Sequence, residues 1–261
     1  MNNFVFWLAS LAALAVAFVA LPGMRIIIAA LMVPYFAVAA WGIFDLRSNY
    51  FVRAYTRSNG EIKRISLTFD DGPDQAITND ILDLLQKFGL HATFFVIAEK
   101  AKALPDIIRR AHKAGHVIAC HDLGHRMSSN FRFSAAMVRD ISESQNIIKN
   151  IIGIKMLLYR PPVGLANPHL GTAIEVCGMK CIGWNRTCRD AGNRRIKNIK
   201  KISRLGITGG DVILLHDCLP VPEYKAEVLQ QLELLFERIK KENFEPVTVD
   251  ELFEIDAYLK D

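Results

Sequence analysis

Two carboxylates, Asp70 and Asp71, stand side by side at the end of an apolar run in this sequence. The run, residues 65–69, is typical of a buried strand, and the turn at Gly72-Pro73 ends it at once. Two like charges in a buried position are unfavourable unless one of them is paired, protonated or bound to a metal. For an isolated Asp-Asp pair, a polar strand end with a capping carboxylate is the competing interpretation. The rest of the chain favours a reactive site.

Reactive or charged side chains also follow later apolar runs: His121, His125, Arg160, Asp190 and His216. We expect Asp71, His121 and His125 to bind a divalent metal ion, because two imidazoles four residues apart share one face of a helical turn and the carboxylate completes three ligands. Three such ligands leave a coordination position open, which is the pattern of catalytic zinc. An isolated pair of this spacing is as often an ordinary surface feature, so the interpretation depends on the neighbouring carboxylates.

The remaining residues supply a base and an acid. Asp70 is placed to act as general base, and Arg160 is placed to pair with it and keep it ionised. His216 is the candidate general acid, because a hydrolysed amide must release its nitrogen in protonated form. Asp190 is placed to orient His216 and hold it cationic. Taken singly, Arg160 indicates a rigid turn beside two prolines and His216 a strand-end cap; together these residues predict metal-assisted acyl hydrolysis.

The elements that must position these residues alternate between short apolar runs and longer amphipathic ones. We expect strands over 65–69, 92–96, 117–120, 156–159, 180–184, 211–215 and 245–249. We expect helices over 76–88, 105–114, 134–151, 168–177, 195–205 and 223–242. This alternation predicts one α/β domain of parallel strands with helices packed outside them, in a barrel-like arrangement. The candidate residues then lie at the carboxyl ends of strands, where such barrels assemble their sites.

The start of the chain differs in character, since Arg25 is the only charged side chain among the first 44 residues. Residues 4–21 and 26–44 are apolar runs, each about as long as is needed to cross a bilayer. We favour a hairpin that turns at 22–25; a cleaved signal peptide and a buried pair of soluble helices are the alternatives. We therefore predict three parts: a transmembrane or re-entrant helical hairpin over 1–46, a connector over 47–60 and a catalytic domain over 61–261.

Charge and cysteine usage bear on the side of the membrane. Five basic residues follow the second apolar run: Arg47, Arg53, Arg57, Lys63 and Arg64. The acidic residues of the same stretch are Asp45 and Glu61, so its net charge is positive. The positive-inside tendency would keep the domain in the cytoplasm, with the hairpin in a bacterial inner membrane and membrane lipids as its partners. Five cysteines, an odd number without framework spacing, indicate reduced thiols and agree with this side. The net charge of +5 is mild, and no nucleic-acid partner is expected.

At the residues that carry the chemistry, the chain resembles a known family. It is similar to the polysaccharide deacetylases of the NodB-homology type, also called carbohydrate esterase family four. The resemblance extends over about residues 61–250, in five ordered segments: Thr68-Phe69-Asp70-Asp71-Gly72-Pro73, Ala92-Thr93-Phe94-Phe95-Val96, Gly115-His116 leading to His121-Asp122-Leu123-Gly124-His125, Arg160-Pro161-Pro162-Val163-Gly164 and Leu214-Leu215-His216-Asp217.

The resemblance implies a fold, a reaction and a set of roles. The implied fold is a distorted (β/α) barrel of parallel strands, and the implied reaction is hydrolysis of N-acetyl groups on amino sugars. Asp70 is implied as the base and His216 as the acid. Asp71, His121 and His125 are implied as ligands of a divalent metal, with Zn²⁺ favoured and Co²⁺, Ni²⁺ or Mn²⁺ as alternatives.

Three positions depart from the family's pattern. Asp122 stands where the motif that contains His121 and His125 usually has Ser or Thr, which adds a carboxylate near the metal. Val163 replaces an aromatic residue of the motif that begins at Arg160, and the contribution of this motif to the oxyanion hole comes from a backbone N–H. Ala191 follows Asp190 where Trp is common, which removes an aromatic wall of the acetyl pocket, and Trp184 of the preceding strand need not replace it. We therefore expect intact catalysis with an unusual substrate preference.

A basic segment near residue 200 bears on the substrate. Residues 194–205 carry six basic side chains around an apolar stripe: Arg194, Arg195, Lys197, Lys200, Lys201 and Arg204. A solvated helix face is the simpler interpretation, and a face toward anionic headgroups or a phosphate is the alternative. We hypothesise that the enzyme deacylates an amino sugar on a polyprenyl phosphate at the cytoplasmic membrane surface. Peptidoglycan or an exported polysaccharide is the alternative substrate, and a catalytically inactive, membrane-tethered glycan-binding module is the alternative of a different class.

Overall fold

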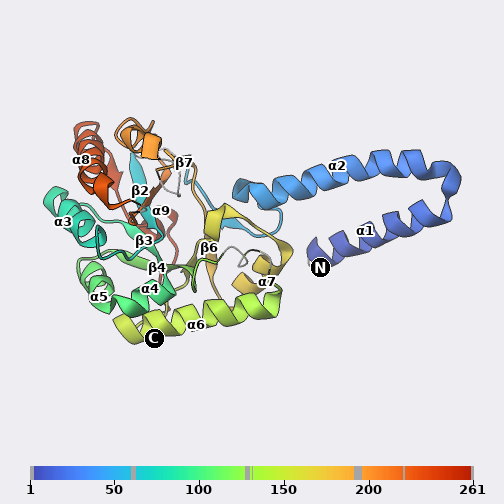
Figure 1. The fold of residues 1–261 in the computed structure, drawn as a ribbon, viewed down its shortest axis with the longest axis horizontal. Coiled ribbons are helices and arrows are strands. Elements are labelled where there is room, and N and C mark those ends of the chain that lie inside the picture. The colour runs from blue at the N-terminus through green and yellow to red at the C-terminus, as the bar shows by residue number, and fades with distance from the viewer. Residues whose placement is uncertain are drawn as a thin grey trace.

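The computed structural model describes residues 3–59, 63–126, 130, 132–190, 196–219 and 221–259. Its first two helices, α1 (Asn3–Ala20) and α2 (Arg25–Phe44), form a hairpin that extends away from the rest of the molecule (Figure 1). The turn between them is a short 3-10 helix, Pro22–Met24, as expected for a proline followed by glycine. Among the described residues, only the helix over 22–44 is long and apolar enough to cross a membrane. The predicted helical hairpin is therefore present, while its insertion in a membrane stays a prediction.

Nine strands form one parallel sheet within the described residues. They are β1 (Ala54–Tyr55), β2 (Arg64–Asp70), β3 (Thr93–Ile97), β4 (Val117–Asp122), β5 (Leu158–Tyr159), β6 (Lys180–Ile182), β7 (Arg186–Thr187), β8 (Val212–His216) and β9 (Glu245–Pro246). The order is β1-β6-β5-β4-β3-β2-β8-β7, and β9 joins β2. Every pair of neighbouring strands is parallel. The sheet curls into a half-barrel, which confirms the predicted fold class.

Helices pack against the outside of this sheet (Figure 1). They are α3 (Thr78–Phe88), α4 (Ala98–Ala103), α5 (Pro105–Lys113), α6 (Ser134–Ile152), α7 (Pro168–Val176), α8 (Lys225–Lys241) and α9 (Val249–Phe253). In α8, an apolar face is buried at helical spacing: Leu232, Leu235, Phe236 and Ile239. Strands β3 and β4 are buried along their whole length, because parallel strands are covered on both faces.

The sequence misses several short elements. Residues 54–55, inside the predicted connector 47–60, form the edge strand β1, and Val52 beside them lies in the core. The elements β7, α4 and α9 are too short to give a periodic pattern. In place of the α-helix expected over 195–205, the structure has a 3-10 helix of six residues, Ile196–Lys201. Arg194 and Arg195, which the prediction used, lie outside the described residues.

Candidate active site

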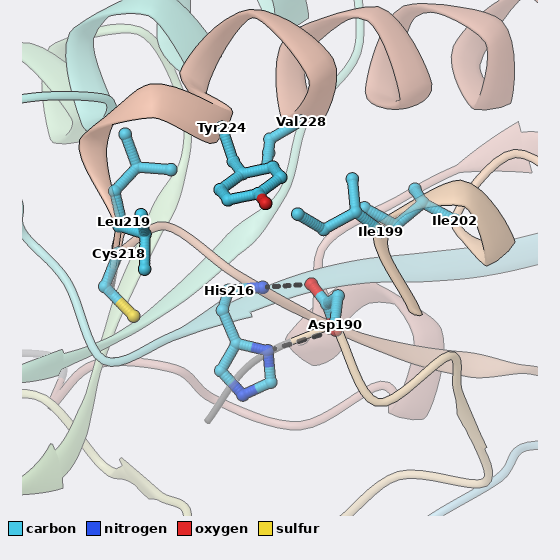
Figure 2. Close-up of a pocket in the computed structure, with 9 residues that line it drawn as sticks. Asp190, Ile199, Ile202, His216, Cys218, Leu219, Tyr224 and Val228 are labelled. Carbon is cyan, nitrogen blue, oxygen red and sulfur yellow. Dashed lines mark hydrogen bonds and ion pairs between the residues drawn. The ribbon is translucent and has the colours of Figure 1, made fainter. Parts of the chain in front are cut away.

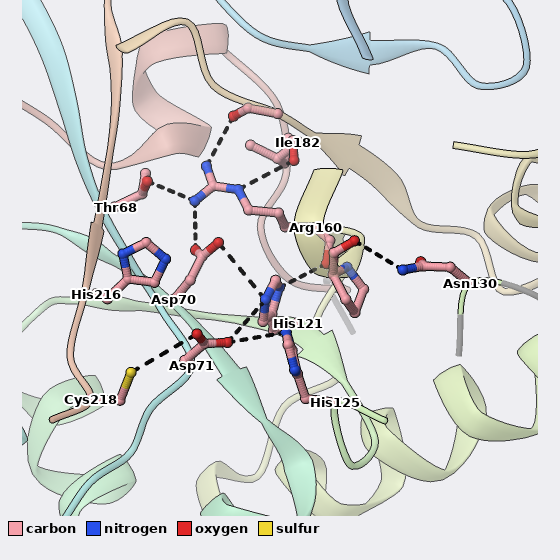
Figure 3. A network of polar contacts seen from close by, with 12 residues as sticks. Thr68, Asp70, Asp71, His121, His125, Asn130, Arg160, Ile182, His216 and Cys218 are labelled. Atoms are coloured by element: carbon pink, nitrogen blue, oxygen red, sulfur yellow. Dashed lines mark hydrogen bonds and ion pairs between the residues drawn. The ribbon is translucent and has the colours of Figure 1, made fainter. Parts of the chain in front are cut away.

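The end of β2 brings two carboxylates into one groove (Figure 3). Asp70 is the last residue of β2 and is paired in register with His216 of β8. Residues in register on neighbouring parallel strands point to the same face, so the predicted base and the predicted acid lie side by side. Asp71 has a φ of 72°, in the left-handed region. This conformation ends the alternation of the strand, and Asp71 lines the same groove as Asp70.

Strand β4 carries one predicted ligand, and the loop after it carries the other. His121 lies where the pairing of β3 with β4 shifts register, and a shift of this kind redirects a side chain. His125 follows in the loop with a φ of 48°. The prediction that the two imidazoles share a helical turn is therefore wrong. A strand residue and a left-handed loop residue bring the rings together, with centroids 5.1 Å apart.

Asp71, His121 and His125 form a three-residue cluster of metal-ligand type. Each imidazole Nε2 lies 3.3 Å from Asp71 Oδ1, and one ligand atom from each residue lies within 4.8 Å of the others. Among the described residues, buried Asp71 Oδ1 has no hydrogen-bond partner. His121 Nδ1 lies 3.0 Å from the carbonyl oxygen of Arg160, so a proton on Nδ1 leaves the Nε2 lone pair facing Asp71. This donor set fits a divalent metal ion such as zinc.

The charges in this cluster also suit a cation. Burial raises the pKa of the Asp71 carboxyl, but the close contact with His121 and the charges of His121 and His125 outweigh burial and hold that pKa well below its usual range. Burial lowers the pKa of His121, but the charges of Asp70 and Asp71 raise it above its ordinary value. Two carboxylates thus dominate the local potential, and a bound cation would replace the proton on His121.

Arg160 holds Asp70 from inside the half-barrel (Figure 3). Its fully buried guanidinium donates through Nη1 to Asp70 Oδ1 at 2.6 Å and to Thr68 Oγ1 at 2.7 Å. Nη2 and Nε donate to the carbonyl oxygens of Gly183 and Ile182, at 2.9 and 3.4 Å. Because these contacts tie Arg160 to β2 and to the end of β6, the position of the Asp70 carboxylate is fixed. The guanidinium charge also offsets the charge of the buried Asp70 carboxylate.

His216 is paired with Asp190 at the end of β8 (Figure 2). The imidazole Nδ1 lies 3.2 Å from Asp190 Oδ1, and the backbone N–H of His216 donates to Oδ2 at 3.2 Å. Burial lowers the pKa of His216, but the charge and hydrogen bond of Asp190, followed by the charges of Asp70 and Asp71, raise it to about 9. His216 is therefore protonated at neutral pH, with Nδ1 engaged by Asp190 and Nε2 left for the groove.

A small, mainly apolar cavity lies beside this pair (Figure 2). Besides His216 and Asp190, its lining is Ile199, Ile202, Cys218, Leu219, Val221, Tyr224 and Val228. The apolar wall keeps water away from one side of the imidazole and the carboxylate. The attraction between opposite charges is stronger in such surroundings, which helps to hold His216 cationic.

The groove has further walls that the sequence did not assign. Along with the predicted residues, it is lined by Val163, Trp184, Thr187, Arg189 and Leu214. Trp184 supplies an aromatic wall. The Trp that is common in the family after Asp190 is replaced by Ala191, which lies outside the described residues. A Cβ on Gly164 would lie 2.4 Å from the Trp184 ring, so only glycine allows this approach. Thr68 was missed as well, although its spacing of two from Asp70 indicated the same face of β2.

Asp122 does not join the metal-ligand cluster. It follows His121 in β4 and lines a separate small cavity with Met137, Tyr159 and Leu170. Because neighbouring strand residues point to opposite faces, the carboxylate lies on the other side of β4 from the groove. The expectation of an additional carboxylate near the metal is therefore wrong.

Comparison with known proteins relates this chain to deacetylases. The sequence model of the family described as polysaccharide deacetylase matches residues 57–182. A peptidoglycan-N-acetylglucosamine deacetylase of Bacillus cereus is 30% identical over 192 residues, which cover 73% of this chain and 88% of the relative. The peptidoglycan-N-acetylmuramic acid deacetylase PdaC of Bacillus subtilis is 32% identical over 195 residues, which cover 74% of this chain and 39% of the relative.

Solved structures agree as well. The crystal structure of a peptidoglycan N-acetylglucosamine deacetylase matches with a TM-score of 0.68 at 25% identity, and the match covers 77% of this chain and 93% of that one. Family members are metal-dependent hydrolases of N-acetyl amide bonds, and the groove described above contains a cluster suited to such an ion. The chain belongs to the polysaccharide deacetylase family.

Proposed function

We propose that this protein removes N-acetyl groups from the amino sugars of a peptidoglycan-like glycan. The observation that carries the proposal is the single groove lined by Asp70, the Asp71–His121–His125 cluster and His216 (Figure 3). The curated relatives named above act on peptidoglycan, which supports a polymeric substrate over the lipid-linked sugar favoured by the sequence.

The metal in this proposal is Zn²⁺, held by Asp71, His121 and His125, with Co²⁺, Ni²⁺ or Mn²⁺ as alternatives. Two imidazoles and one carboxylate are a ligand set of catalytic zinc sites. When bound, the ion supplies Lewis acidity at the carbonyl oxygen of the substrate.

Asp70 and His216 move the protons of the reaction. Asp70 accepts a proton from the water that attacks the acyl carbon, while Arg160 holds its other oxygen. His216 donates the proton on Nε2 to the sugar nitrogen as the carbon–nitrogen bond breaks, and Asp190 holds Nδ1. The products are a free amine and acetic acid, which ionises to acetate; Asp70 then releases its proton to solvent and His216 takes one up from solvent, which restores both groups.

Acetate release from defined substrates tests this proposal. The purified protein is stripped of metal, reloaded with Zn²⁺ and incubated with chitooligosaccharides and N-acetylated peptidoglycan fragments. We expect acetate from the loaded protein and none after a chelator is added. If the loaded protein binds these glycans without releasing acetate, it is instead a glycan-binding module without catalysis.

A lipid-linked amino sugar is the second candidate substrate. The observation that favours it is a backbone hydrogen bond between the loop beside the groove and α2. The N–H of Ala166, which follows the Arg160–Gly164 motif, donates to the carbonyl oxygen of Ile43 in the last turn of α2 at 3.0 Å. This contact joins the loop beside the groove to an apolar helix with many exposed hydrophobic side chains. A substrate anchored in the same bilayer could reach the groove from there. Release of acetate or formate from a polyprenyl-phosphate sugar, but not from glycan polymers, would favour this candidate.

We also propose that the hairpin anchors the protein in a bacterial inner membrane. The exposed apolar side chains of α1 and α2 support this proposal. The basic flank after α2 favours a cytoplasmic domain, whereas a peptidoglycan substrate requires the opposite side. Reporters fused after Asp261 distinguish the two: activity of a periplasmic reporter such as alkaline phosphatase contradicts the cytoplasmic orientation.

A further inference from the structure

The two loops that carry the metal-ligand cluster are held by a third segment that carries no ligand. This segment is the end of β3 and the first turn of α4. Three of its residues make polar contacts with the ligand loops, and we call Ile97, Glu99 and Lys100 the α4 bracket. No periodic pattern predicts α4, because six residues are too few for one.

On the Asp71 side, the bracket fixes a backbone conformation that is unfavourable by itself. Asp71 is left-handed, a conformation that costs free energy for residues other than glycine, although less for Asp than for most, so surrounding contacts help to hold it. Lys100 Nζ donates to the carbonyl oxygen of Asp71 at 2.7 Å. The N–H of Ile97 donates to the carbonyl oxygen of Gly72, the next residue, at 2.9 Å. Two consecutive peptide groups after the ligand are thus tied to the α4 bracket.

On the histidine side, the bracket holds the loop between the two imidazoles. The N–H of Glu99 donates to the carbonyl oxygen of Leu123 at 2.9 Å. The Glu99 carboxylate also lies against Gly124, where a Cβ would come 2.7 Å from Oε2. Arg126 donates to the same carboxylate at 3.3 Å. One short segment therefore contacts both ligand loops.

We propose that the α4 bracket, and Lys100 above all, positions Asp71 relative to His121 and His125 for the metal. Ligands that already stand at the right separation lose less freedom when the ion binds, so the bracket raises metal affinity. The inference rests on the proposed metal role of these three residues. Charge alone has the opposite effect, because the ammonium group of Lys100 repels a cation. Removing that charge thus separates positioning from electrostatics.

Equilibrium Zn²⁺ affinity tests the proposal. The full-length metal-free protein is titrated with Zn²⁺ against a chromophoric chelator, at one pH, for wild type, Lys100→Met, Lys100→Arg and Lys102→Met. Lys102 is the matched control, since it is exposed on the same helix. We expect Lys100→Met to bind Zn²⁺ about 10-fold to 100-fold more weakly, as is usual for groups that support metal ligands. Lys100→Arg should recover much of the affinity, and Lys102→Met should match wild type.

The outcomes are distinct. Unchanged or tighter Zn²⁺ binding by Lys100→Met overturns the positioning role. Weaker binding by Lys102→Met to the same extent also overturns it. Thermal unfolding of each metal-free variant checks folding, and Lys100→Gln replaces Lys100→Met if that variant does not fold. If His121→Ala binds Zn²⁺ as tightly as wild type, the metal site itself is wrongly assigned, which is a failure of the proposed function and not of the bracket alone.

Discussion

The groove has an interior side and a rim side, and the two are built differently. On the interior side, Asp70 and Arg160 are almost fully buried, and every guanidinium nitrogen has a hydrogen-bond acceptor. On the rim side, Asp71, His125 and Val163 are at least partly exposed, and all three have positive φ. The interior is therefore rigid and satisfied, whereas the rim stores backbone strain and keeps a buried oxygen without a hydrogen-bond partner.

This difference separates two adjacent carboxylates by function. Asp70 already has a protein cation beside it, so it needs no metal to offset its charge. Among the described residues, the Asp71 carboxylate faces two imidazoles and forms no ion pair with Lys or Arg, since the ammonium group of Lys100 donates to its backbone carbonyl oxygen. The two adjacent carboxylates therefore have different counter-charges: the guanidinium of Arg160 for Asp70 and the proposed metal ion for Asp71.

The largest expected effect comes from separating these two roles. We expect Asp70→Asn to lower kcat by about 10²-fold to 10⁴-fold, because the general base is lost, while Zn²⁺ affinity stays near that of wild type. We expect His121→Ala to lose both metal and turnover. Acetate release and chelator competition measure the two properties. An Asp70→Asn enzyme with full activity would reject the assignment of the base.

The next effect tests the interior as a folding element. We expect Arg160→Met to lower the free energy of unfolding by about 3–5 kcal/mol, because Asp70 is then buried without a counter-ion. On the rim, His125→Ala should cost the metal-free protein less than about 1 kcal/mol, since the pair with Asp71 is partly exposed. Urea denaturation of both metal-free variants measures the difference. Equal losses would mean that the rim is as structural as the interior.

The pH dependence tests the acid that stands between the two sides. With a pKa of about 9 in the metal-free protein, His216 is protonated at neutral pH, and kcat/KM of the loaded enzyme should fall once the pH is high enough to deprotonate it. The raised pKa also adds stability that is fully present below about pH 6.5 and lost as the pH rises through about 9. Asp190→Asn should move both transitions down by roughly 1–3 pH units. NMR titration of the metal-free protein measures the pKa of His216, and pH–rate profiles measure the alkaline fall in kcat/KM. If Asp190→Asn shifts neither transition, Asp190 is not the partner that raises the pKa of His216.

The interior could be predicted from sequence better than the rim. Buried strands give continuous apolar runs, so the ends of β2 and β8 and the residues Asp70 and His216 were located correctly. Arg160 next to two prolines was expected to pair with Asp70, and it does. These features follow from local patterns together with the rule that sites form at the carboxyl ends of parallel strands.

The rim depends on backbone details that no periodic pattern records. Neither the positive φ of Asp71 and His125 nor the register shift at His121 can be read from residue types, because Asp and His adopt positive φ more often than most residues but still in a minority of positions. Trp184 reaches the groove only through packing against Gly164, which follows from the tertiary fold. Two-residue strands such as β1 were missed because two residues cannot show a period.

The smallest expected effect concerns the strain of the rim itself. Val163 has φ 60° and ψ 3°, which is unfavourable for a β-branched residue, and its side chain is 70% exposed, so little packing offsets the strain. We expect Val163→Asn to stabilise the protein by about 1 kcal/mol, because Asn tolerates the left-handed region. The midpoint of urea denaturation measures this change. The matched control is Val176→Asn, because Val176 is exposed on α7 and has helical backbone.

A variant that is more stable but has a higher KM for the glycan would mean that the strained valine contacts substrate. A variant of unchanged stability would mean that the neighbouring prolines already absorb the strain, and the contrast between interior and rim would then rest on the metal ligands alone.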